Sequence, residues 1–306
     1  MFYIENSIIE MRISMKPFIK WAGGKGQLIG ELEKRFPVGF GENIKKYAEP
    51  FVGGGALLFH VLGKYKLDEV YISDTNAELI NVYKTIRNDV YSLIKILENY
   101  QTEWSTLSEE DRKNVFYTRR DKYNQKKESK ILDEEMAALF IFLNRTCFNG
   151  LYRVNSKGQF NVPCGHYSNP TICNKDNLLE ISNHLNNVQI ICGDYKVSEN
   201  FVDKNTFVYF DPPYRPLNET SSFTSYVEEE FNDKEQIELS EYIRKLAQKG
   251  CFVLASNSDP KNTCSDDNFF DDLYKGFDIR RVEANRNINS KSSGRGKITE
   301  ILVSTY

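Results

Sequence analysis

The chain has 306 residues, 40% of them apolar and 27% charged, with a formal net charge of −3. This length and composition can bury a sizeable core and exclude collagen-like, low-complexity and largely disordered proteins. No apolar run reaches the roughly 18–20 residues of a membrane span, and residues 1–18 contain acids but lack the apolar core of a secretory signal. We therefore expect a cytoplasmic protein without membrane contact, with one large domain and a smaller inserted one.

Short apolar runs that are rich in β-branched and aromatic residues predict strands. They cover residues 46–52, 69–74, 188–194, 207–214, 251–258 and 298–305. Helical spacing of apolar residues predicts helices over 27–36, 77–97 and 234–249, and Gly250 stands where the last helix would be capped. The alternation of strands and helices predicts an α/β fold, a mostly parallel sheet with helices on both faces.

The alternation fails between residues 85 and 187. Charged helical sequence comes first, over 89–143, and is followed by the polar and aromatic stretch NRTCFNGLYRVNSKGQFNVPCGHYSNP. Its Asn-Gly and Lys-Gly pairs are turn signals between short strand-like pieces. We expect residues 85–187 to form an inserted domain with a β-hairpin, between the two parts of the main domain, 1–84 and 188–306.

Acidic residues are absent from residues 11–30, 136–175 and 284–299, although each window contains several Lys and Arg. Local potential, rather than net charge, decides whether a phosphate backbone is attracted. The windows therefore favour a nucleic-acid partner, although loops can also lack acids by chance. Six cysteines and three histidines occur without a C-x-x-C pair or zinc-finger spacing, so we expect reduced thiols and no metal.

Two predicted strands end in motifs that suit a nucleotide-like ligand. In AEPFVGGGALL (48–58) three glycines would let the backbone approach a ligand at the carboxyl edge of the sheet, unless they only form a tight turn. In YISDTN (71–76) the carboxylate of Asp74 could bond ribose hydroxyls. Alternatively, Asp74 or Thr75 could cap the helix that starts at 77. A third motif, KPFIKWAGGKGQ (16–27), combines lysines, glycines and Trp21, and its plain alternative is a surface loop.

The fourth motif, DPPY at 211–214, ends a strand-like run in a stiff Pro-Pro corner. The exocyclic nitrogen of adenine is a poor nucleophile because its lone pair is delocalised into the ring. Acceptors aimed at its two N–H groups would localise that lone pair, and Asp211 and the carbonyl of Pro212 could be these acceptors. Tyr214 could stack on the base, which must leave the duplex to be reached. A rigid loop without function is the alternative.

Together these motifs resemble the α-group, Dam-like family (D12 class) of DNA adenine-N6 methyltransferases. KPFIKWAGGK resembles the family's N-terminal cofactor motif, EPFVGGGAL its glycine motif, SDTNAELIN its second acidic motif and DPPY its catalytic motif. PLNETSSFTSY and KSSGRGKITEILVSTY also look like the family, so the resemblance runs from Lys16 to Tyr306. It implies a Rossmann-like S-adenosylmethionine-dependent methyltransferase sheet with an inserted helical and β-hairpin target-recognition domain.

The resemblance implies a role for each residue that matches a motif. Asp211, Pro212 and Tyr214 would be catalytic. Lys25 would lie near the carboxylate of S-adenosylmethionine, and Asp74 would take the ribose hydroxyls. The remaining cofactor-binding residues would be Trp21, Pro50, Phe51, Gly53, Gly55, Asp194 and Tyr195.

The stretch NRTCFNGLYRVN (144–155) would contact the DNA, as the resemblance implies. Phe148 would wedge into the base stack, where relatives often carry tyrosine, and Asn149 would face the base left unpaired. Lys20 falls where relatives contact the outer guanine.

The resemblance also implies direct reading of the bases. Leu151 would contact a thymine methyl group and Arg153 a guanine, whereas Arg145 would hold a phosphate. This stretch and GQFNVPCGHY look like the GATC-specific branch of the family. Besides Phe148, the small departures from that branch are Thr146 and the Cys164-Gly165-His166 run.

We therefore expect an enzyme that transfers a methyl group from S-adenosylmethionine to a flipped-out adenine, in GATC, of double-stranded DNA. A companion restriction endonuclease is a further expected partner, and we expect a monomer or a weak dimer on DNA. One rival is a cytosine-N4 or protein-glutamine methyltransferase of the same fold, but these usually carry Ser or Asn in place of Asp211. The other rival is a DNA-binding relative without activity.

Overall fold

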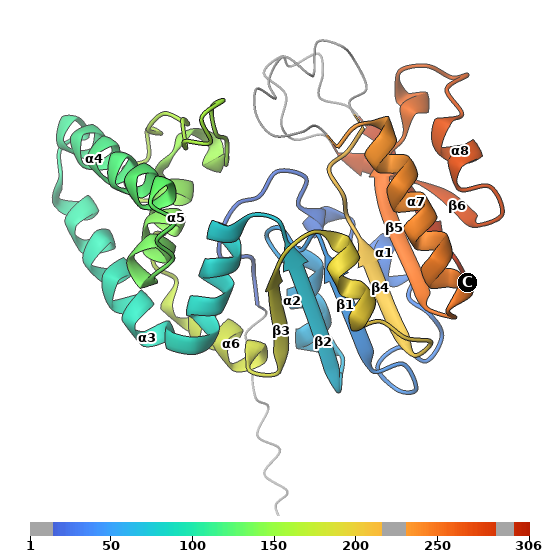
Figure 1. Ribbon diagram of the computed structural model, residues 1–306. Coiled ribbons are helices and arrows are strands. Elements are labelled where there is room, and N and C mark those ends of the chain that lie inside the picture. Colours follow the sequence, from blue (N-terminus) through green and yellow to red (C-terminus); the bar gives the residue numbers. More distant parts are fainter. Residues whose placement is uncertain (1–14, 216–230, 286–296) are drawn as a thin grey trace, which may run out of the picture.

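The fold is built around one mixed sheet. The computed structural model describes residues 15–215, 231–285 and 297–306 (Figure 1). The strands in these ranges are β1 (Lys46–Pro50), β2 (Glu69–Asp74), β3 (Val188–Cys192), β4 (Thr206–Phe210), β5 (Phe252–Ser258), β6 (Asp278–Asn285) and β7 (Lys297–Ser304). They lie in the order β3-β2-β1-β4-β5-β7-β6. The first five in this order are parallel and β7 is antiparallel to β5 and β6, so the predicted mostly parallel sheet is confirmed, with β6 unpredicted.

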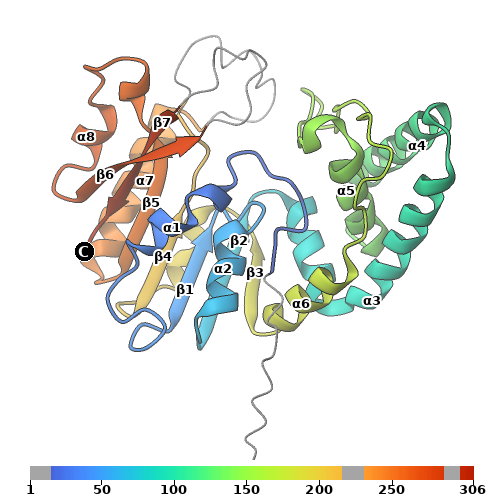
Figure 2. The ribbon, with the colours of Figure 1, turned by 180° about the vertical axis from the view of Figure 1, so that it is seen from behind.

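Helices cover both faces of this sheet, as the sequence predicts. The α-helices are α1 (Ile29–Glu33), α2 (Ala56–Lys64), α3 (Ala77–Thr106), α4 (Glu109–Glu128), α5 (Glu134–Thr146), α6 (Lys175–Leu185), α7 (Asp233–Gln248) and α8 (Phe269–Leu273). Short 3-10 helices are η1 (Lys25–Gln27), η2 (Phe148–Gly150), η3 (Tyr195–Asn200) and η5 (Pro260–Asn262). Helix α7 lies in front of the sheet in Figure 1, and α2 lies in front of it in the reverse view of Figure 2.

Successive side chains of the central strands fill two separate cores. Tyr47 and Phe207 belong to the larger core, which also contains buried residues of α2, α3, α5 and α6. Their neighbours Ala48 and Val208 belong to the second core, with residues of α7 and α8. Because strand side chains alternate between faces, these apolar runs are buried on both sides, as the sequence indicates.

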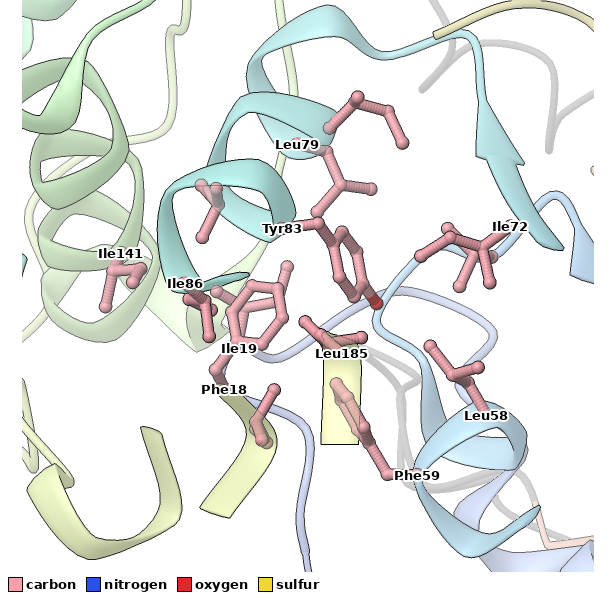
Figure 3. Packing of buried hydrophobic residues seen from close by; sticks show 14 of the residues in the cluster. Phe18, Ile19, Leu58, Phe59, Ile72, Leu79, Tyr83, Ile86, Ile141 and Leu185 are labelled. Atoms are coloured by element: carbon pink, nitrogen blue, oxygen red, sulfur yellow. The ribbon is translucent and has the colours of Figure 1, made fainter. Parts of the chain in front are cut away.

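Tyr83 of α3 lies within the larger core (Figure 3). Its ring meets Phe18 edge-on, with ring centres 4.9 Å apart. Its hydroxyl donates a hydrogen bond of 3.0 Å to the carbonyl of Gly53. A buried phenol needs such an acceptor, and this one joins α3 to the glycine loop that follows β1.

The expected insert is continuous with the main domain. Helix α3 runs from the sheet into the insert, with one break in its helical backbone at Asp89 (φ −152°, ψ 61°), so the expected boundary at 84/85 falls inside this helix. Figures 1 and 2 show α4 and α5 at the end of the molecule away from β6. Their core residues, such as Phe116 and Phe140, share one apolar cluster with Ile72 of β2. The insert therefore has no separate core.

The expected β-hairpin is present in a reduced form. After α5, isolated antiparallel bridges join Cys147 to Cys164 and Val154 to Phe160. Asn149 and Gly150 have positive φ angles of 57° and 65°, which a tight Asn-Gly turn requires. Residues 147–164, here called the reading hairpin after their expected role, thus have the predicted turn without regular strands.

The described residues contain no helix that is long and apolar enough to cross a membrane. Within the same ranges, no group of three or more His, Cys, Asp or Glu side chains could hold a metal ion. The PLNETSSFTSY motif at 216–226 lies outside the described residues, as do residues 1–14 and 286–296.

Candidate active site

The Pro-Pro corner, defined here as residues 211–215, begins where β4 ends. One oxygen of Asp211, Oδ1, is bonded by Lys25 Nζ at 2.8 Å and by Ser256 Oγ at 2.9 Å. Among the residues that the structure describes, the other oxygen, Oδ2, has no hydrogen-bond partner, and neither has the carbonyl of Pro212. The corner therefore holds a carboxylate in one orientation and leaves two acceptor atoms for a ligand.

Lys25 is buried, and its ammonium group contacts both this corner and the N-terminal loop. Besides its ion pair with Asp211, its ammonium group donates to the carbonyl of Gly23 at 2.7 Å and lies 4.4 Å from the ring centre of Tyr214. Burial raises the pKa of Asp211, and the positive charge of Lys25 opposes that rise. The structure thus places Lys25 with the DPPY motif, while its contact with a cofactor carboxylate stays a prediction.

Neighbouring elements fix the backbone of the corner. The amide of Gln236 in α7 donates to the carbonyl of Pro213 at 3.0 Å and accepts from Asn257 at 3.0 Å. Ser258 donates to the carbonyl of Arg215 at 3.2 Å. Because the buried Gln236 is bonded at both ends of its amide, the corner has one low-energy arrangement rather than several.

Two side chains of the corner are also anchored. The hydroxyl of Tyr214 donates to Glu300 of β7, and burial raises the pKa of this phenol well above its usual value, so it stays a donor. Arg215 donates to both carboxylate oxygens of Asp233, at 2.7 and 3.1 Å, and to Asp267 at 2.8 Å. Such paired guanidinium–carboxylate bonds fix geometry as well as charge.

A second buried acid lies close to Asp211. Glu49 of β1 is 3% exposed and accepts a hydrogen bond of 2.7 Å from the hydroxyl of Tyr47. Burial raises the pKa of Glu49 to about 8 against the effect of the Tyr47 bond, and the charge of Asp211 adds to the rise. The raised pKa of Glu49 therefore favours its protonated form at neutral pH.

The glycine loop after β1 packs against the end of β2. Phe51 has a positive φ of 66°, an uncommon conformation for a bulky residue and one that is concentrated at functional sites. The carboxylate of Asp74 accepts from the N–H groups of Gly53 at 3.1 Å and Asn76 at 2.9 Å. The indole of Trp21 lies so near Gly53 that a Cβ there would be 2.8 Å from it. The expected cofactor residues of three separate motifs thus meet at the carboxyl edge of the sheet.

The structure tests the plain structural alternatives for two motifs, and the ligand contacts of both motifs stay predictions. Asn76, whose side chain accepts the N–H of Leu79 at 2.8 Å, caps α3, so a cap at Asp74 or Thr75 is wrong. Gly55 has a positive φ of 71° at the start of α2, and a Cβ there would collide with the hydroxyl of Tyr83. The turn and its packing against Tyr83 therefore already explain why residue 55 is a glycine.

The remaining expected cofactor residues border the same edge. The rings of Phe51 and Tyr195 are stacked, with centres 5.5 Å apart. Asp194 caps η3 by accepting the N–H of Lys196 at 2.8 Å, and Pro50 is the buried last residue of β1. Contact of these residues with a cofactor stays a prediction.

Lys20 and the Asn-Gly turn of the reading hairpin are held together by one buried amide. Asn144 accepts from the backbone N–H of Lys20 at 2.8 Å and donates to the carbonyls of Lys20 at 2.8 Å and Gly150 at 3.0 Å. The side chain of Lys20 lies against Gly150, where a Cβ would collide with it. Two segments that are far apart in sequence therefore form one surface.

The side chains expected to meet DNA are exposed on this surface. Phe148 is 50% exposed and Asn149 is exposed on its positive-φ turn. Arg153 is exposed, and its Nε donates to Asn161 at 2.8 Å. Leu151 is half-buried. Their contacts with bases stay predictions.

Arg145 has a contact that the sequence does not indicate. Its Nε and Nη2 donate to the carbonyl of Phe18 at 3.1 and 2.7 Å, and Nη2 also reaches the carbonyl of Pro17 at 3.4 Å. Arg145 therefore holds the segment that leads to Lys20, and its expected phosphate contact stays a prediction.

Trp21 joins the cofactor edge to the reading hairpin. Its ring is stacked on Tyr152, with centres 5.5 Å apart and planes 23° apart. The hydroxyl of Tyr152 accepts from Lys127 at 3.0 Å, and Lys127 pairs with Glu78 in the first turn of α3 at 3.1 Å. The two groups of site residues are thus parts of one continuous site.

Sequence reasoning missed Glu49, Ser256 and Glu300. Glu49 directly precedes the Pro-Phe pair of the glycine motif, and an acid inside an otherwise apolar strand is a signal that could have identified it. Ser256 and Glu300 lie on predicted strands without any comparable signal. Only the pairing of β5 with β4 and β7 brings them to the corner.

Comparison with known proteins agrees with this geometry. The family described as D12 class N6 adenine-specific DNA methyltransferase matches residues 21–288. Type II methyltransferase M.MjaIII of Methanocaldococcus jannaschii is 49% identical, over 96% of this chain and 100% of its own length. Type II methyltransferase M1.LlaDCHI of Lactococcus lactis subsp. cremoris is 40% identical, over 98% and 99%. The DNA adenine methylase of Vibrio cholerae is 31% identical, over 94% and 95%. This chain therefore belongs to the D12 class of N6 adenine-specific DNA methyltransferases.

Proposed function

We propose that this adenine-specific DNA methyltransferase acts on GATC in double-stranded DNA, takes its methyl group from S-adenosylmethionine, and is the modification enzyme of a restriction-modification pair. The observation that carries the chemistry is the carboxylate of Asp211, with Oδ1 bonded to Lys25 and Ser256 and Oδ2 left without a described partner. The GATC assignment rests on the resemblance of the reading hairpin to the GATC-specific branch.

The acceptor atoms of the corner suit an aromatic amine. Oδ2 of Asp211 and the carbonyl of Pro212 can each accept one N–H of the adenine amino group, which draws the nitrogen lone pair out of conjugation with the ring. The ring of Tyr214 offers a face on which the flipped-out base can stack. Because Lys25 and Ser256 already hold the carboxylate, little reorganisation remains when the base arrives.

The carboxyl edge of the sheet fits the expected donor. S-adenosylmethionine would supply an activated methyl group. A carboxylate at the end of the second strand, here Asp74, is where sheets of this kind hold a ribose. The positive-φ backbone at Phe51 and Gly53 gives a tight turn there, and the Phe51–Tyr195 stack supplies an apolar wall. We propose Trp21 and Lys25 as the neighbours of this site from the N-terminal loop.

The reading hairpin supports recognition from the major groove. The Nε of Arg153 is bonded to Asn161, which orients the guanidinium, and its Nη groups have no hydrogen-bond partner in the described part of the chain. Those groups can bond N7 and O6 of a guanine. Lys20, fixed beside the Asn-Gly turn, would contact the outer guanine, and the exposed ring of Phe148 would fill the space that the flipped base leaves.

The printed names of the relatives support the proposed pairing with an endonuclease. Those from Methanocaldococcus jannaschii and Lactococcus lactis are named type II methyltransferases. Such an endonuclease would cut the same sequence where it is unmethylated. We propose a monomer, or a weak dimer, on DNA, because one chain supplies the corner, the cofactor edge and the reading hairpin.

The test is transfer of tritiated methyl groups from S-adenosylmethionine to a set of duplexes. One duplex contains GATC, and each of the others has one base pair of GATC changed. We expect N6-methyladenine in the GATC duplex and strongly reduced incorporation in the rest. Preferred labelling of another sequence would contradict the GATC assignment alone, whereas absence of label from every duplex would contradict the proposed chemistry.

A further inference from the structure

Glu300 brings a second carboxylate to the Pro-Pro corner. It lies on β7, opposite Ser258 of β5, and accepts the hydrogen bond of the Tyr214 hydroxyl. The two residues are 86 positions apart, so only the antiparallel addition of β7 to the sheet places them together. Among the described residues, the Glu300 side chain has no other hydrogen-bond partner, so the bond to Tyr214 is the one directional contact of this carboxylate.

The Tyr214 ring has two restraints of different kinds. Lys25 lies 4.4 Å from the ring centre, an attraction that changes little when the ring tilts or slides. The hydrogen bond from the hydroxyl to Glu300 depends on distance and angle, and it fixes the far end of the ring. Of these two restraints, the bond to Glu300 therefore determines the direction in which the ring faces.

We propose that Glu300 is a positioning residue for methyl transfer, which holds the Tyr214 ring in the orientation that stacks on the target base. This inference rests on the proposed function, since the stacking of the base on Tyr214 is part of it. Glu300 acts through the hydroxyl of Tyr214 and needs no contact with the base or the methyl donor. Its loss should therefore lower turnover and leave cofactor affinity unchanged.

The experiment is a double-mutant cycle of Tyr214→Phe and Glu300→Ala. Each single variant should lower kcat by roughly 10–100-fold, the range for one charge-assisted hydrogen bond, and the double variant should fall no further. A GATC duplex with 2-aminopurine in place of the target adenine gives a second readout, because stacking on the ring quenches its fluorescence. Both single variants should give the same brighter emission than wild type, and Glu300→Gln, which keeps an acceptor, should restore most of the quenching.

Additive losses of kcat in the double variant, or emission unchanged by Glu300→Ala, would overturn the proposal. Failure of the proposed function is distinguishable, since wild type itself would then transfer no methyl group to the duplex. If Glu300→Ala does not fold, Glu300→Leu, which also removes the acceptor but fills the space, completes the same cycle with Tyr214→Phe. Tyr65→Phe is the matched control, because Tyr65, directly after α2, donates to Glu33 of α1 in a similar pair outside the site. It should match wild type in kcat and emission.

Discussion

The Pro-Pro corner and the reading hairpin differ in how the side chains proposed for catalysis and for base reading are held. At the corner, Asp211, Tyr214 and Arg215 are each bonded to side chains from other elements of the same chain. In the reading hairpin, Phe148 and Arg153 are exposed, and the side chain of Arg153 has one described hydrogen bond. A catalytic group must be in place before the substrate arrives. The hydrogen bonds of a side chain that reads bases, in contrast, form only when DNA binds.

This difference has a consequence for substitutions. A change at the corner should alter the rate on every duplex by a similar factor, because the chemistry is common to all of them. A change in the reading hairpin should alter the rates on some duplexes more than on others. The predictions below either strengthen this contrast or break it.

The largest effect is expected for Asp211→Ala. It removes the acceptor atom Oδ2, and loss of one preorganised electrostatic group costs about 10²–10³-fold in kcat. Initial rates of methyl transfer should fall by at least this factor on GATC and on altered duplexes alike, while duplex affinity stays near that of wild type. Near-normal turnover would refute the role of Asp211. Because the substitution leaves Lys25 buried without its partner, Asp211→Asn is the control for folding.

Lys25→Met should change the pH dependence of the same step. Without the ammonium group, burial would raise the pKa of Asp211 further, and a protonated carboxyl accepts poorly from an amine. The rate should therefore fall most at low pH and recover as pH rises, relative to wild type. Lys20→Met is the matched comparison. It should weaken DNA binding without changing how the rate depends on pH. A loss that is the same at every pH would show that Lys25 does not tune Asp211.

A smaller and more selective effect is expected for Arg153→Ala. Loss of a bidentate guanine contact costs about 1–3 kcal/mol at the cognate site and relaxes discrimination at one guanine position only. Arg153→Lys should rescue poorly, because lysine lacks the planar fork. The measurement is the rate on each duplex of the GATC set. A uniform loss across the set would mean that Arg153 does not read sequence, and the contrast with the corner would fail.

Arg145→Ala is the natural companion to that experiment. Its bonds to the carbonyls of Pro17 and Phe18 hold the segment before Lys20, and a phosphate contact would also be independent of sequence. Both roles predict weaker activity on all duplexes by a similar factor. The two roles separate by thermal denaturation without DNA, where only the structural role lowers the melting temperature.

The sequence predicts the parts of this molecule that are local in the chain. Strand periodicity places β4, and the motif after it is rigid because of its own prolines, so Asp211 and Tyr214 could be assigned directly. The partners of those residues could not be assigned, since Ser256 and Glu300 reach the corner through strand pairing. Strand β6 was missed because the stretch DIRRVEAN is charged and lacks a buried apolar run.

The contact of Arg145 with the N-terminal segment could not be predicted from the sequence for a related reason. An arginine in an acid-free window indicates a phosphate contact when only the sequence is known. The competing acceptors, the carbonyls of Pro17 and Phe18, come from a segment more than a hundred residues away. Every residue carries a backbone carbonyl, so the residue types do not show which carbonyl will accept such a bond.

The last prediction, Glu49→Gln, concerns stability rather than rate and tests the buried acid beside the corner. Burial raises the pKa of Glu49 in the folded protein to about 8, whereas the ordinary value that applies to an unfolded chain is 4.5. Between these values the folded state binds more protons, so the free energy of unfolding should fall as pH rises. Glutamine cannot titrate and keeps an acceptor for Tyr47. The variant should therefore match wild type most closely below pH 4.5 and gain on it as pH rises to about 8. Urea denaturation of both proteins across this range is the measurement. Parallel stability curves of the two proteins over this pH range would mean that folding does not raise the pKa of Glu49.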